Sequence, residues 1–146
     1  MQDIELDKYA SFVKSPDINL ICDPLISNTP IKTIEYSRVY LDGSRLELSN
    51  DQVVAKNSII SCSKITKHIY APALIPKYQR YLLMSPWVAR LDESTKDVFM
   101  GRLASHKEKH GLDNEFRIII THHKYTEMFH FYSAQNTINV SYYFGL

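Results

Sequence analysis

Two tyrosines and an arginine alternate along one predicted strand, and their residue types suit ligand binding. Tyr36, Arg38 and Tyr40 are two positions apart, so in a strand their side chains project from one face. A guanidinium beside two phenol groups could orient a small molecule with polar ends. The hairpin described below adds Glu47 to this face, and Trp87 is a further candidate ligand contact. The structural alternative is an Arg38–Glu47 ion pair with tyrosines packed around it, which stabilises a sheet without binding a ligand.

Two histidines spaced four residues apart raise the alternative of a metal site. His106 and His110 would share one helix face, and a histidine from residues 122–130 could complete a zinc site with them. The pattern is not H-E-x-x-H, because Glu108 is in the wrong place to polarise a metal-bound water. Histidine also suits a helix C-terminus, where the dipole favours positive charge. We therefore predict no metal, no cofactor and no catalytic residue.

The chain carries no complete catalytic or nucleotide-binding motif. Its 4 glycines form no G-x-G-x-x-G, Walker A or G-x-S-x-G pattern, and phosphate-cradling loops depend on glycine. Residues 61–64 match S-x-x-K, but the K-T-G element that accompanies it in penicillin-recognising enzymes is absent. These absences predict a protein that is not an enzyme.

The composition is that of one globular domain. Its 146 residues are 45% hydrophobic and 23% charged, enough for a core without disulfide or metal support. With 17 basic and 16 acidic residues, a net charge of +1 is too small for a free-standing nucleic-acid binder. Residues 1–7 lack a secretory signal, and Cys22 and Cys62 have no close spacing. We predict a cytoplasmic protein that contacts neither membrane nor nucleic acid.

A first hairpin must position the tyrosine–arginine face. Residues 33–41 and 44–49 alternate apolar and polar side chains and predict two strands. Asp42-Gly43 between them predicts a two-residue type I′ turn. That turn places Arg38 opposite Glu47, so one face is aromatic and charged while the other is apolar.

A second hairpin is predicted in the last third of the chain. Residues 115–121 and 125–133 form its strands, and both faces carry non-polar residues. We therefore expect it at the centre of the sheet, covered on both sides. Its predicted register pairs are Phe116 with Phe131 and Ile118 with Phe129.

The remaining elements are mostly helices. Ser15-Pro16 favours a helix start, whereas Asp23-Pro24 is expected to force the chain out of a helix. Asn50 or Asp51 can cap a partly helical region, and Ser94 is predicted to cap the best helix. The predicted helical ranges are 4–14, 15–21, part of 51–71, and 94–110 with Gly111 at its end; 78–85 predicts a strand, and 137–144 fits either.

Together these elements predict an α+β fold. About five mostly antiparallel strands form one sheet with helices packed on its faces, as in a PAS- or GAF-like sandwich. We expect a single sensor-like domain over residues 1–146, with residues 1–30 forming an N-terminal helical segment packed on it.

Several short segments share the layout of one family of sensor domains. They are Asp23-Pro24-Leu25, Ile34–Ser44 with Leu46 and Leu48-Ser49, His110-Gly111-Leu112, Phe116–Ile120 and Glu127–Phe131. In this order they resemble the N-terminal sensor domains of LuxR-type bacterial transcriptional regulators. The resemblance implies a PAS- or GAF-like fold, a small-molecule signal, a homodimer, and control of transcription through a C-terminal helix-turn-helix.

The chain departs from that family in two respects. The acyl-homoserine-lactone receptors carry a W-x-x-x-Y motif, whereas Trp87 is followed four positions later by Leu91. The family also continues into a helix-turn-helix where this sequence stops. We therefore expect either a regulator without that module or a stand-alone sensor.

Two functional hypotheses follow. The first is a non-catalytic, cytoplasmic sensor that binds an unidentified small molecule between its sheet and helices and acts as a homodimer. The second is a ligand-free interaction module, whose tyrosine-rich face binds a partner protein or a second copy.

Overall fold

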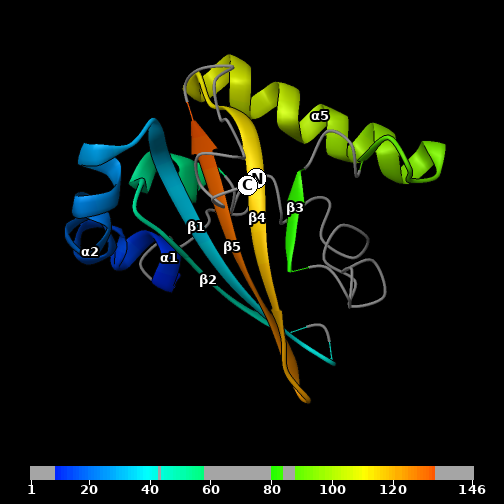
Figure 1. Ribbon diagram of the computed structural model, residues 1–146, viewed down its shortest axis with the longest axis horizontal. Helices are drawn as coiled ribbons and strands as arrows, with labels where there is room; N and C mark the ends of the chain where they lie inside the picture. Colours follow the sequence, from blue (N-terminus) through cyan, green and yellow to red (C-terminus); the bar gives the residue numbers. More distant parts are fainter. Residues whose placement is uncertain (1–8, 43, 58–79, 84–87, 134–146) are drawn as a thin grey trace, which may run out of the picture.

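The computed structural model describes residues 9–42, 44–57, 80–83 and 88–133 (Figure 1). In this part of the chain the strands form one antiparallel sheet in the order β2-β1-β5-β4-β3. Four strands have five or more residues, and β3 is a three-residue strand at one edge. The bounds are β1 Ile31–Tyr40, β2 Arg45–Ser49, β3 Tyr81–Leu83, β4 Asp113–Thr121 and β5 Tyr125–Ser133.

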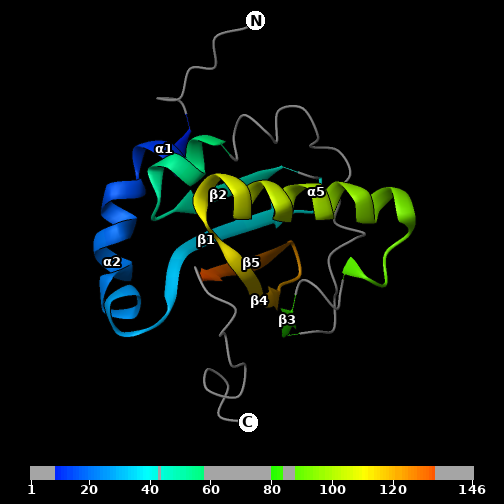
Figure 2. The same cartoon turned by 90° about the horizontal axis from the view of Figure 1, so that it is seen from above.

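The described helices lie around this sheet. Figures 1 and 2 show α1 and α2 together beside β1 and β2, and α5 crossing one end of the strands. A further helical turn covers residues 52–57. The bounds are α1 Ala10–Val13, α2 Ser15–Asn28 and α5 Glu93–His110. The predicted α+β class, with an antiparallel sheet and helices, is thereby confirmed.

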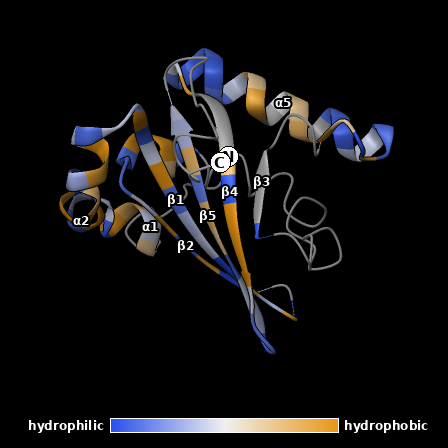
Figure 3. Cartoon of the chain, in the orientation of Figure 1, coloured by the Kyte–Doolittle hydropathy of each residue, from blue (hydrophilic) through white to orange (hydrophobic). Residues whose placement is uncertain are grey.

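Small apolar clusters lie on both faces of the sheet. On one face, Ile34 and Phe116 pack against Cys22, Leu25 and Ile26 of α2. On the other, Tyr132 packs with Val54 and Leu112. Neighbouring residues of a strand point to opposite faces, so Phe131 joins the first cluster and Tyr132 the second. Figure 3 shows hydrophobic residues along α2 and a hydrophobic stretch of β4.

The second hairpin has the predicted register. Phe116 lies opposite Phe131, and Ile118 lies opposite Phe129. The rings of Phe116 and Phe131 stack with centroids 4.8 Å apart. The hairpin sits inside the sheet, between β1 and β3, as expected for strands with apolar residues on both faces.

The first hairpin does not have the predicted register. The Tyr40 N–H donates to the Ser44 carbonyl, so three residues and not two separate the paired positions. The Asp42 carboxylate accepts hydrogen bonds from both the backbone N–H and the hydroxyl of Ser44. That N–H is therefore not available for the backbone hydrogen bond that would close a two-residue turn. This shift by one residue carries Glu47 to the opposite face from Arg38.

The expected break at Asp23-Pro24 is also wrong, because α2 continues through it to Asn28. Proline inside a helix removes one backbone donor. Side chains near the helix end supply other bonds: Asn28 donates to the Pro24 carbonyl and Thr29 to the Leu25 carbonyl. Packing of Leu25 and Ile26 on the sheet further holds this last turn in helical form.

The helix caps were predicted with mixed success. Asp51 accepts from the N–H groups of Val53 and Val54, as expected of a cap. The cap of α5 is Asp92, which accepts from the Thr95 N–H, and not Ser94. Gly111 ends α5 as predicted. The predictions for residues 4–8, 58–71 and 137–144, and for the conformation of Gly43, lie outside the described residues.

Gly111 and Gly101 provide a matched test of the end of α5. Gly111 has a φ of 64°, and no atom lies within 4 Å of the place that a Cβ would occupy at either glycine. Gly111→Ala should lower the free energy of unfolding by about 1 kcal/mol through backbone strain alone. Gly101→Ala, inside the helix, should raise it by about 0.5–1 kcal/mol. Urea unfolding measures both, and shifts of the same sign would contradict this helix boundary.

Candidate functional site

Arg38 is the centre of a polar network on one face of the sheet. It lies in β1 directly opposite Glu127 of β5, and its Nη2 is 3.0 Å from Glu127 Oε1. Its Nε donates to the Tyr36 hydroxyl oxygen at 3.0 Å, and that hydroxyl donates to the same carboxylate oxygen at 2.5 Å. The three side chains therefore form a closed triangle that fixes the guanidinium.

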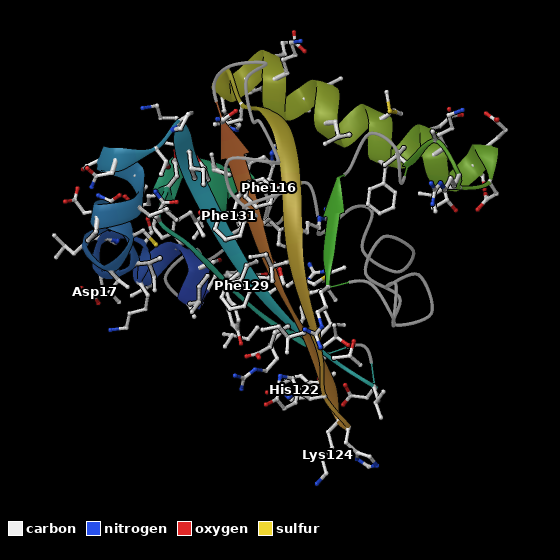
Figure 4. All side chains as sticks on the ribbon, in the orientation of Figure 1. Asp17, Phe116, His122, Lys124, Phe129 and Phe131 are labelled. Carbon is white, nitrogen blue, oxygen red and sulfur yellow. The ribbon has the colours of Figure 1, made fainter. Side chains whose placement is uncertain are left out.

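Aromatic rings surround this triangle. The Arg38 guanidinium carbon lies 4.6 Å from the centroid of the Tyr125 ring, within cation–π distance. Tyr40 is the register partner of Tyr125, with ring centroids 5.8 Å apart. His122, close to the tip of the β4–β5 hairpin (Figure 4), has its Nε2 2.8 Å from the second Glu127 oxygen. Both carboxylate oxygens are thus engaged.

Hydrogen bonds stabilise the charged forms of Arg38 and Glu127. Bonds from Tyr36, His122 and Arg38 lower the pKa of the Glu127 carboxyl from 4.5 to about 2. Bonds to Tyr40, Glu127 and Tyr36 raise the pKa of Arg38 above its ordinary value. Burial, and then the bond to Glu127, raise the pKa of Tyr36. At neutral pH the network therefore holds one positive and one negative charge.

The network is accessible from the surface. The Arg38 side chain is 33% exposed and that of Glu127 is 16% exposed. Leu46 and Ile120, which face the same way by register, are both exposed. This face therefore offers a fixed cation among aromatic rings, bordered by apolar side chains.

The structure brings together three of the five predicted site residues. Tyr36, Arg38 and Tyr40 share one face as expected. Glu47 does not join them: it lies on the opposite face and pairs with Arg45 at 3.3 Å. The predicted Arg38–Glu47 pair is wrong because the hairpin loop has one residue more than expected. Trp87 lies outside the described residues, and ligand binding by this set stays a prediction.

Three residues of the network were not predicted from the sequence. Glu127, Tyr125 and His122 come from the second hairpin, which was not expected to lie beside the first. Glu127 is the only carboxylate of β5, and Arg38 has no acidic partner on its own hairpin face. A search for a carboxylate on another strand would have found it.

A second polar group lies on the opposite face and is buried. Glu35, His130 and Arg117 lie side by side across β1, β5 and β4, with exposures of 8%, 1% and 5%. The Tyr132 hydroxyl donates to Glu35 at 2.7 Å. Separating buried charged groups from their partners is strongly unfavourable, so a different strand register would be destabilised here.

The histidines considered for a metal site take part in other contacts. His106 packs against Tyr132, with ring centroids 5.2 Å apart, and meets the edge of His110. His110 Nε2 is 3.2 Å from the Asn57 side-chain nitrogen, and His122 contacts Glu127. Across the residues that the structure describes, no three His, Cys, Asp or Glu side chains gather in a way that could hold a metal ion.

No family model, curated protein or solved structure matches this chain. Among the described helices, none has the length and apolar character required to cross a membrane. The functional argument therefore depends on the geometry of the chain's own residues.

Glu127 provides a pH test of the network. Its carboxyl has a lowered pKa in the folded state, so its stabilising contribution is complete above pH 4.5 and is lost as the pH falls towards 2. Wild-type stability should fall across this window. Glu127→Gln should be less stable at pH 7 and show a shallower fall. Chemical denaturation at each pH measures this, with exposed Glu108→Gln as control; an unchanged slope in Glu127→Gln would contradict the assignment.

Proposed function

We propose that this chain is a non-catalytic sensor domain that binds a small molecule at the Arg38 network. Following its resemblance to LuxR-type regulators, the domain would control transcription through dimerisation or an attached DNA-binding domain. The proposal includes a PAS- or GAF-like sandwich as the overall fold of the domain. One observation carries it: Arg38 is held by several partners, yet a third of its side chain is exposed.

A fixed guanidinium favours ligand binding for an entropic reason. Arginine loses much rotamer freedom when it binds a ligand, and that loss weakens binding. Here Glu127 and Tyr36 already restrict Arg38 before any ligand arrives. A ligand oxygen can accept from guanidinium N–H groups that these partners do not use.

The surrounding side chains indicate the class of ligand. Tyr40, Tyr125 and Phe129 offer aromatic surface on the same face as Arg38. A matching molecule has a carbonyl or carboxylate oxygen at one end and an apolar body. Such a ligand would bridge β1 and β5, and it would stabilise the packed state by mass action.

A surface observation favours a second candidate, the interaction module. Leu46 is 37% exposed and Ile120 is 42% exposed on the face that carries Tyr36 and Tyr40. Aromatic, arginine and aliphatic side chains together are typical of the centre of a protein interface. A partner protein would then cover the surface that the first candidate assigns to a small molecule.

Native mass spectrometry of protein purified from its own host tests both candidates. Wild-type chain should carry a small molecule that is released on denaturation. Arg38→Ala should lose it, while Arg90→Ala, a control at another exposed arginine, should retain it. Loss of a protein partner in Arg38→Ala, with no small molecule in either sample, would favour the interaction module. Neither species in wild-type samples would contradict both candidates.

A further inference from the structure

His122 belongs to the Arg38 network, although the proposed ligand site has no role for it so far. Its Nε2 lies 2.8 Å from Glu127 Oε2. The other oxygen of that carboxylate, Oε1, accepts from Arg38 at 3.0 Å and from the Tyr36 hydroxyl. One carboxylate therefore connects His122, labelled in Figure 4, to the guanidinium of Arg38.

The Tyr125 ring makes a second connection between the same two groups. Its centroid lies 4.5 Å from that of the His122 ring and 4.6 Å from the guanidinium carbon of Arg38. The separation between the imidazole and the guanidinium is thus spanned by a single ring and a single carboxylate. Charges this close together interact appreciably at physiological ionic strength, because the screening length is about 8 Å.

His122 is the member of the network that can change its net charge in the physiological range. Histidine side chains generally gain a proton as the pH falls from about 8 to about 5. Glu127 keeps its negative charge over that range, because its hydrogen bonds lower the pKa of its carboxyl to about 2. With a neutral His122 the charges of Arg38 and Glu127 cancel, whereas a protonated His122 adds a positive charge.

The other groups near His122 do not offset this change. Tyr36 and Tyr40 of β1 and Tyr125 of β5 carry phenols, and phenols are uncharged at these pH values. His123 and Lys124 follow His122 in the hairpin turn and are exposed. Lysine keeps its charge throughout this range, and His123 provides a matched control because no contact described above joins it to the network.

We propose that His122 makes the Arg38 site a pH-dependent binder of carboxylates: protonation of His122 gives the network a net positive charge, so carboxylate affinity rises as the pH falls. The inference rests on the proposed ligand site, and it names the class of ligand and its regulation. A neutral amide of the same shape carries no net charge, so its affinity should change much less.

Benzoate and benzamide are suitable probes, because they pair the same aromatic ring with a carboxylate or a neutral carbonyl. Their affinities are measured by NMR titration at about pH 5.5 and about pH 8.5, on either side of the ordinary histidine range. A unit charge a few ångströms away near a protein surface changes the affinity for an anion about three- to tenfold. Wild-type chain should therefore bind benzoate more tightly by this factor at the lower pH, and benzamide should bind almost equally at both.

Two glutamine variants assign the effect to one histidine. His122→Gln keeps a side-chain donor for Glu127 but cannot gain a charge, so benzoate should bind equally at the two pH values. His123→Gln removes the neighbouring histidine and should retain the wild-type pH effect. Loss of the pH effect in His123→Gln, or its persistence in His122→Gln, would overturn the proposal.

A measurement without ligand tests the coupling itself. The Arg38 Nε–H donates to Tyr36, and its NMR signal is identified by its loss in Arg38→Ala. This signal should move between pH 8 and pH 5 in wild type and in His123→Gln, but not in His122→Gln; a signal that stays fixed in wild type would overturn the inference. Binding that requires Arg38 but ignores pH would overturn the inference alone, whereas binding of neither probe through Arg38 would contradict the proposed site as well.

Discussion

The pair of Arg38 and Glu127 joins two parts of the chain that are 89 residues apart. β1 belongs to the first hairpin and β5 to the second, and their pairing makes one sheet from the two. A register slip of one residue would turn every side chain of a strand to the other face. Arg38 would then lose Glu127, and Tyr36 would lose the acceptor of its hydroxyl proton. The site and the sheet therefore depend on the same register.

The opposite face imposes the same register independently. Glu35 and His130 are cross-strand partners there, and Tyr132 donates to Glu35. These side chains are buried, so a slip would leave charged and polar groups without their partners in the interior, at a cost of several kcal/mol. The exposed network contributes less, because solvent weakens its charges. We infer that the buried row specifies the strand arrangement and the Arg38 network uses it.

Local features of the fold could be predicted from sequence, whereas distant pairings could not. The register of Phe116 with Phe131 follows from alternation on either side of a short turn, and Gly111 marks a helix end because it tolerates positive φ. Nothing local indicates that β1 lies beside β5, so Glu127 was missed. The wrong placement of Glu47 has a local cause. The Asp42 carboxylate binds the Ser44 N–H, and the hairpin loop is one residue longer than predicted.

That added loop residue has consequences for both surfaces of the first hairpin. It removes Glu47 from Arg38, so the carboxylate of the ligand face comes from β5, and it leaves Glu47 beside Arg45 on the other face. It also places Leu46 directly opposite Arg38. A ligand bound at Arg38 would then contact Leu46 of the neighbouring strand, so this one loop residue decides both the charge and the apolar border of the proposed site.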